Sequence, residues 1–97
     1  MSTHIVMMKL TNQGAKAIKD APARIDDSIK TMEKMGGKLI AFYLTTGEYD
    51  YIGIGEVPND EVLLTFLLGL GTMGTVRTTT VRAFSREEFA AAVKKLP

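Results

Sequence analysis

The sequence predicts an α+β fold of the ferredoxin-like class, with helices on one face of a four-stranded antiparallel sheet. Two observations support this prediction. Four runs rich in β-branched and aromatic residues alternate with helical patterns in the order β-α-β-β-α-β, and a C-terminal amphipathic helix follows them. The 97 residues suffice for one domain, 1–97, with a single hydrophobic core, and neither a linker nor an internal repeat interrupts them.

Composition excludes several classes of function. Twelve basic and eleven acidic residues give a net charge of +1, which favours neither nucleic acid nor an anionic membrane as a partner. Cysteine is absent, so disulfides, thiolate nucleophiles and iron–sulfur ligation are excluded together. The N-terminus lacks the pattern of a signal peptide, and no apolar run reaches the roughly 18 residues of a membrane span. We therefore expect a cytoplasmic protein.

The first half of the chain predicts a strand and a long helix. The apolar run Thr3–Leu10 is typical of a strand, and residues 11–22 predict an irregular connection with room for one helical turn. Pro22 suits the first turn of a helix, and the pair Gly36-Gly37 ends it. Apolar residues recur on one side of this helix, at Ile25, Ile29 and Met32. Charged residues mark the opposite side, at Arg24, Asp27, Lys30 and Lys34.

The second half predicts a hairpin, a helix, a strand and a final helix. Two β-rich runs flank the short turn TGEY, as in a β-hairpin: Lys38–Thr45 and Asp50–Val57. Residues 58–61 open a helix that runs to about Gly74, and the strand Thr75–Phe84 follows it. The last helix begins with the pattern of a capping box, formed by Ser85 and Glu88.

If the hairpin turn has four residues, Thr45 lies opposite Asp50, and this register sorts the hairpin side chains onto two faces. The more apolar face has glycines opposite Phe42 and Ile40, so it is assigned to the helix side. It comprises Ile40, Phe42, Leu44, Tyr51, Gly53, Gly55 and Val57. The other face comprises Leu39, Ala41, Tyr43, Thr45, Asp50, Ile52, Ile54 and Glu56. Left uncovered, it would expose apolar surface on the order of a few hundred Å². We expect a second copy of the chain to cover it.

The helix after the hairpin gives a second argument for self-association. Its apolar residues cover nearly the whole circumference: Leu63, Leu64, Phe66, Leu67, Leu68 and Leu70. A helix of this kind needs burial on more than one side. A long loop or the C-terminal helix could cover its outer side, but one neighbouring subunit on the open sheet face would account for both observations.

Two carboxylates, Asp50 and Glu56, predict a polar site on the open face, because a carboxylate among apolar neighbours either pairs with a cation or has a raised pKa. The candidate cations are Arg77 and Arg82, and only one can reach this face because an odd number of positions separates them. The predicted ligand site comprises Tyr43, Asp50, Ile52, Glu56 and one of these arginines. It could bind a small molecule or transfer a proton; alternatively, the charges form a buried salt bridge that fixes a dimer register.

His4, the only histidine, lies on the first strand. It could be a general base, a metal ligand or part of the ligand site, whereas the simpler expectation is a strand-end histidine bonded to backbone or water. A metal site needs three or four ligands, and no second histidine is present, so we predict no metal. The run GLGTMG ends a helix instead of opening one, which argues against a dinucleotide site, and no other cofactor is indicated.

The segments GGKLIAFYLTTGEYDYIGIGEVPNDE and GTVRTTTVRAFSREEF resemble the GYD domain family. The family's name matches the turn Gly47-Glu48-Tyr49-Asp50, in which this chain has an extra glutamate, and the resemblance extends over essentially the whole chain. The family is similar to the dimeric α+β barrels, in which two ferredoxin-like sheets face each other, so the resemblance also implies self-association. It implies no settled activity, because related barrels include cofactor-independent monooxygenases, lactone isomerases, haem-binding enzymes and regulatory ligand-binding domains.

These observations lead to one principal hypothesis and two alternatives. We expect a homo-oligomer that binds a small hydrophobic or aromatic ligand between the sheet and the partner subunit. The first alternative is a cofactor-independent enzyme, similar to a monooxygenase or an isomerase, that acts on such a molecule with Asp50 or His4 as proton acceptor. The second is a structural or regulatory oligomerisation module whose cavity is filled by side chains.

Overall fold

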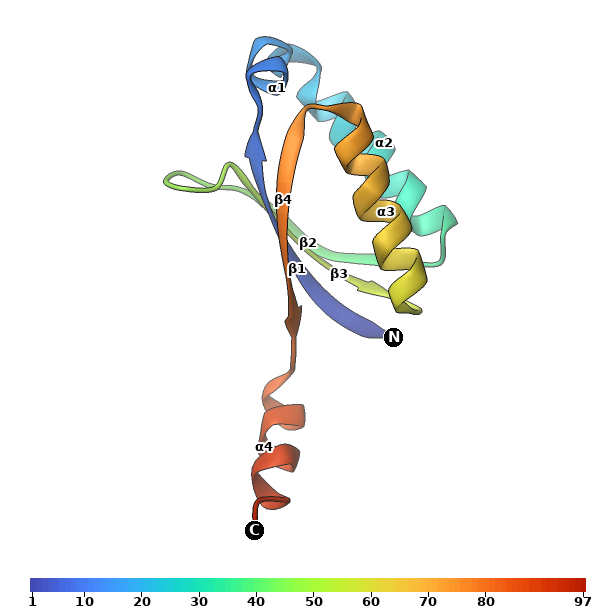
Figure 1. Cartoon of the computed structure of the whole chain (residues 1–97), viewed down its shortest axis with the longest axis vertical. Helices are drawn as coiled ribbons and strands as arrows, with labels where there is room; N and C mark the ends of the chain where they lie inside the picture. Colours follow the sequence, from blue (N-terminus) through green and yellow to red (C-terminus); the bar gives the residue numbers. More distant parts are fainter.

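The computed structural model describes residues 1–97, and its elements follow the predicted order (Figure 1). The strands are β1 (Ser2–Leu10), β2 (Lys38–Leu44), β3 (Tyr51–Val57) and β4 (Val76–Ala83). The helices are α1 (Asn12–Lys16), α2 (Ala21–Lys34), α3 (Asp60–Met73) and α4 (Arg86–Lys94), with a 3₁₀ turn, η1, at Ile18–Asp20. The strands form one antiparallel sheet in the order β2-β3-β1-β4, which confirms the predicted ferredoxin-like class.

Helices α2 and α3 lie side by side on one face of the sheet, and no helix covers the other face (Figure 1). The core between the two layers is formed by six buried hydrophobic residues: Met8, Ala21, Met32, Tyr51, Val57 and Leu70. No large side chain is fully buried in this core. None of the helices is long and apolar enough to cross a bilayer.

The helix ends follow from local chemistry. Helix α2 begins at Ala21, one residue before the expected Pro22, and ends before Gly36, whose φ of +92° suits glycine. The Asn59 side chain accepts a hydrogen bond from the Val62 amide at 2.9 Å and so caps α3. We expected the glycines of GLGTMG to end this helix, but only Gly74 does so, with φ +74°, while the other two lie within α3.

The connection after β1 is more regular than predicted, because Thr11 organises it into the short helix α1. Its hydroxyl accepts from the Gly14 amide at 3.1 Å and donates to the Gly74 carbonyl at 2.6 Å. Gly14 packs against the start of β4 so closely that a Cβ atom there would lie 2.1 Å from the Thr75 carbonyl oxygen. Only glycine fits at this position, and α1 is thereby fixed to the end of the sheet.

The hairpin has the four-residue turn that the register required, since the Thr45 amide donates to the Asp50 carbonyl at 2.9 Å. A β-bulge at Ile40 nevertheless makes part of the face assignment wrong. The extra residue interrupts the alternation of side chains, so Leu39 pairs with Gly55 and joins the helix side, whereas Ile40 is 49% exposed. Leu44, also assigned to the helix side, is exposed because the hairpin tip extends beyond the helices (Figure 1).

Helix α4 projects away from the rest of the molecule, whose longest dimension is 53 Å (Figure 1). Only Phe84 and Ser85 separate it from β4, and it makes no substantial contact with another element. The predicted capping box is confirmed: the Glu88 amide donates to Ser85 Oγ at 3.0 Å, and the Ser85 amide donates to Glu88 Oε1 at 2.9 Å. The alternative that the C-terminal helix covers the outer side of α3 is therefore wrong.

Candidate functional site

The open face, meaning the sheet face opposite α2 and α3, has a contiguous apolar centre. Ile5 lies in register with Ile54 of β3 on one side and Val81 of β4 on the other. The same registers place further residues on this face: Met7, Tyr43, Ile52 and Thr79. Tyr43 is 62% and Val81 43% exposed. A surface of this kind on one face of an antiparallel sheet is typical of an interaction site.

The structure distributes the predicted site residues over the length of the sheet. Tyr43 and Ile52 are cross-strand neighbours on the open face. Asp50 directly precedes β3, whereas Glu56 lies near its other end, in register with Thr3. At about 3.3 Å per strand residue, the two carboxylates are roughly 20 Å apart. Within one chain they cannot act together on one small molecule.

The two candidate arginines lie on opposite faces, as their spacing predicted. Arg77 is on the open face in register with Lys9, and its side chain makes no hydrogen bond or ion pair. Arg82 is in register with His4 on the helix side, where its guanidinium donates to the Thr3 carbonyl at 3.2 Å and to the Ala83 carbonyl. It also lies 4.4 Å from the centroid of the Phe84 ring. Arg82 is thus engaged in joining the ends of β1 and β4.

Within one chain, neither Asp50 nor Glu56 forms a salt bridge with an arginine. The single ion pair in the structure joins Lys9 and the turn residue Glu48 at 3.4 Å, and both side chains are well exposed. Asp50 instead accepts a hydrogen bond from the Leu10 amide at 2.8 Å through Oδ2, and its own amide donates to the Met8 carbonyl. Asp50 therefore provides the hydrogen-bond acceptor for the last backbone amide of β1, which is a structural role.

His4 is buried, 7% exposed, on the helix side of β1. Its Nε2 lies 2.9 Å from the Ser2 hydroxyl, so its partner is a side chain and not the backbone or water that we expected. No group of three or more His, Asp or Glu side chains lies close enough to hold a metal ion. His4 and Arg82 consequently do not belong to the open face on which the other predicted site residues were placed.

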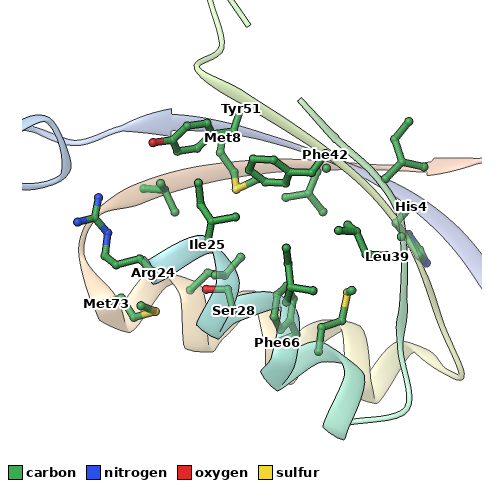
Figure 2. A pocket seen from close by; sticks show the side chains of 18 of the residues that line it. His4, Met8, Arg24, Ile25, Ser28, Leu39, Phe42, Tyr51, Phe66 and Met73 are labelled. Carbon is green, nitrogen blue, oxygen red and sulfur yellow. The ribbon is translucent and has the colours of Figure 1, made fainter. Parts of the chain in front are cut away.

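The sequence did not reveal a cavity of about 100 Å³ between the sheet and helices α2 and α3 (Figure 2). Its walls are mainly hydrophobic, but Arg24, Ser28 and the ring of Tyr51 also line it. Arg24 was predicted on the charged outer side of α2, and that assignment is wrong because its long aliphatic stem lies along the cavity rim. The available signal was the spacing of Arg24 and Ser28, which are four residues apart beside Ile25 and Ile29.

The sheet order, the one-sided helices and the uncovered apolar face define a ferredoxin-like α+β protein with a surface suited to association. The GYD domain family model matches residues 4–93, and the chain belongs to the GYD domain family, as the resemblance predicted. A similar protein from Thermus thermophilus is named glutamine synthetase and cystathionine beta-lyase binding protein. The two chains are 30% identical over 95 residues, which cover 97% of this chain and 100% of that protein.

Solved structures share the fold at low sequence identity. The crystal structure of FFRP-DM1 superposes with a TM-score of 0.57 and 20% identity, over 87% of this chain and 100% of that one. The leucine response regulatory protein LrpA of Mycobacterium tuberculosis gives a TM-score of 0.56 and 19% identity, over 87% of this chain and 51% of that one. At these identities the likeness shows the fold alone.

Proposed function

We propose that this chain forms a cytoplasmic homo-oligomer through the open face and binds a small hydrophobic or aromatic ligand between that face and the partner subunit. The uncovered centre of the face, Ile5, Ile54 and Val81, carries the proposal. Burial of such a surface against a second sheet removes apolar area from water without any rearrangement of the chain. This accounts for a sheet that has helices on only one side.

Helix α4 supports the same proposal. Phe89 and Val93 follow the i, i+4 spacing of one helix side and are 68% and 46% exposed, and Leu96, just beyond the helix, is 70% exposed. A nine-residue helix is marginally stable alone, so this apolar side needs a surface to pack on. Because α4 continues directly from β4, whose Val81 lies on the open face, a partner on that face is the nearest surface for it.

The ligand would lie beside Tyr43 and Ile52, and the free cation Arg77, on the opposite edge strand β4, would lie at the rim of this surface. The Tyr43 ring offers an exposed aromatic surface beside Ile52, which suits an aromatic or aliphatic molecule. Arg77 has no protein partner, so its guanidinium remains available for a polar group at the rim. Glu56, at the far end of β3, belongs to the edge of this surface and would come close to Arg77 only across a subunit interface.

The test is the molar mass of the wild-type chain and of an Ile54→Lys variant, measured by light scattering and native mass spectrometry. We expect a dimer or larger oligomer for the wild type and a folded monomer for Ile54→Lys, because a lysine at the centre of the interface would be buried unpaired. Ile18→Lys places the same change on η1, where the residue is 47% exposed, and should leave the assembly intact. A wild-type monomer, or an oligomeric Ile54→Lys, would overturn the proposal.

A second candidate function is the binding of another protein through the outer side of α3. Leu64 and Leu68 are 58% and 62% exposed, and α3 lies on the layer opposite the open face. One partner on the open face therefore leaves this side of α3 uncovered, contrary to our expectation that it would account for both surfaces. The name of the Thermus relative, a binding protein for two enzymes, favours a protein as the occupant.

The second candidate is tested by interaction measurements between this chain and purified glutamine synthetase or cystathionine beta-lyase. We expect a Leu64→Glu, Leu68→Glu variant to lose binding to the enzyme while it keeps its own oligomeric state. The variant Ile54→Lys separates the two functions, since it should lose self-assembly but keep binding to the enzyme. Absence of binding to either enzyme would remove this candidate and leave the ligand-binding oligomer unaffected.

A further inference from the structure

The cavity between the sheet and α2 and α3 is apolar along most of its length. Sixteen of its twenty-two lining residues are hydrophobic, so the space suits the hydrocarbon part of a molecule better than ordered water. Figure 2 shows Phe42 and Met8 on the sheet side and Ile25 and Phe66 on the helix side, with open space between them. The cavity is formed by one chain and does not depend on assembly.

A glycine on the sheet side of the cavity is not required by the backbone. Gly53 lies in β3 without a positive φ, and a Cβ atom there would meet Phe42 Cδ2 at 3.5 Å and Met8 Cε at 3.7 Å, which are ordinary contacts. Alanine could therefore occupy this position without strain. The absence of a side chain here has the effect of keeping the space open.

One end of the cavity carries a set of hydrogen-bond donors. Arg24 and Ser28 lie one turn apart on α2, and Figure 2 shows the Tyr51 hydroxyl at the same end as the Arg24 guanidinium. Arg24 Nη1 donates to the Ala17 carbonyl at 2.7 Å, which holds the side chain in place. No carboxylate lies within ion-pair distance of the guanidinium, so its charge and its other donors are unused.

We infer that this cavity binds a small amphipathic carboxylic acid. The carboxylate accepts hydrogen bonds from Arg24, in the bidentate geometry that a guanidinium favours, and from the Tyr51 hydroxyl. The hydrocarbon chain lies between the sheet and the helices. Since a cavity of about 150 Å³ holds benzene, a space of about 100 Å³ is suited to a chain of roughly four or five carbon atoms. This site is separate from the ligand surface on the open face.

The test uses 4-methylpentanoate as the probe and 4-methylpentan-1-ol as its uncharged counterpart, titrated into the full chain and followed by NMR. We expect the acid to bind with shifts at residues of α2 and β3, and to bind at least about tenfold more tightly than the alcohol. Arg24→Gln should remove this preference, while Arg24→Lys retains part of it. Lys30→Gln, which removes one positive charge from an exposed position of the same helix, should leave binding unchanged.

A cavity-filling variant distinguishes a binding site from a packing defect. Ser28→Leu should raise the melting temperature by filling the space and should abolish binding of 4-methylpentanoate. If Ser28→Leu raises the melting temperature but the wild type binds neither probe, the cavity is a packing defect and the inference is wrong. Equal binding of acid and alcohol, or unchanged binding by a folded Arg24→Gln, would also overturn it. The molar-mass test on Ile54→Lys is independent of all these outcomes.

Discussion

On the helix side of the sheet, Met8, Tyr51 and Val57 are each less than a tenth exposed, whereas Ile52 and Ile54 on the open face are only partly buried. Both sets alternate along the same strands and are similarly apolar, so hydrophobicity does not distinguish them. The two faces differ in whether helices cover them, because α2 and α3 of the same chain pack on one face and nothing in the chain packs on the other. One face therefore holds the core of the single chain, and the other is the face to which we assign self-association.

The largest expected effect of a single change is on the helix side. Leu70→Ala should lower the free energy of unfolding by about 2–5 kcal/mol, because it removes a buried side chain and enlarges an existing cavity. Urea denaturation measures this loss. Leu68→Ala removes the same atoms from the outer side of α3, where the side chain is 62% exposed, and should change stability by less than about 0.5 kcal/mol. Equal losses would show that the outer side of α3 is also covered in solution.

The second prediction concerns Asp50, which the sequence placed among ligand residues and the structure uses to hold β1. Asp50→Ala should cost about 1–3 kcal/mol, because the Leu10 amide loses its acceptor in a partly buried position. Asp50→Asn keeps an acceptor oxygen and should cost less. Chemical denaturation of both variants provides the measurement. If Asp50→Ala instead keeps its stability and loses ligand binding, Asp50 belongs to the open-face site after all.

Elements whose signals are local were predictable from the sequence. The capping box of Ser85 and Glu88, the turn before Asp50 and the stop at Gly36 depend on neighbouring residues, and all three are present in the structure. The bulge at Ile40 was not predictable, because Leu39, Ile40 and Ala41 are all apolar and give no sign of a break in alternation. The direction of α4 was also hidden, since its amphipathic pattern does not specify which surface it meets.

The candidate site was predictable only in part for a related reason. The spacing of Arg77 and Arg82 correctly separated them onto opposite faces, but their position along the sheet depends on the register of β4 against β1. The role of Asp50 likewise depends on a backbone amide forty residues away in sequence. Arg24 was misplaced because a long side chain can lie along an apolar rim although its charge suggests an outward position.

The next prediction is a smaller gain in stability, at a glycine on the helix side of the sheet. Gly53→Ala should raise the free energy of unfolding by about 0.5–1 kcal/mol, because the new methyl group makes only ordinary contacts and the unfolded chain loses freedom. Gly37→Ala is the contrasting variant, since its Cβ atom would lie 2.7 Å from Met32 Cγ, and it should destabilise. Thermal denaturation of both tests this. Destabilisation by Gly53→Ala would mean that the core is tighter than the structure indicates.

The smallest effect is expected in α4, the element that continues from the open face. The Ser85 amide hydrogen bond lowers the pKa of Glu88 below its ordinary value, and the Ser85 hydroxyl and the charge of Arg82 act in the same direction. A carboxyl with a lowered folded-state pKa stabilises its helix above the unfolded-state pKa, and this contribution is lost as the pH falls through the folded-state value. The helical content of α4, followed by NMR chemical shifts, should therefore decrease on acidification below about pH 4.

Glu88→Gln provides the control for this titration, because the amide oxygen still accepts a hydrogen bond from the Ser85 backbone but carries no titrating charge. The variant should show a lower helical content at neutral pH and less change on acidification. If Glu88→Gln lost helicity as steeply as the wild type, Glu88 would not be the group responsible. Chemical shifts of Met8 and Tyr51 should stay constant over this pH range, since α4 makes no substantial contact with the helix-covered face. Simultaneous changes in both regions would show that α4 packs against the body of a neighbouring chain.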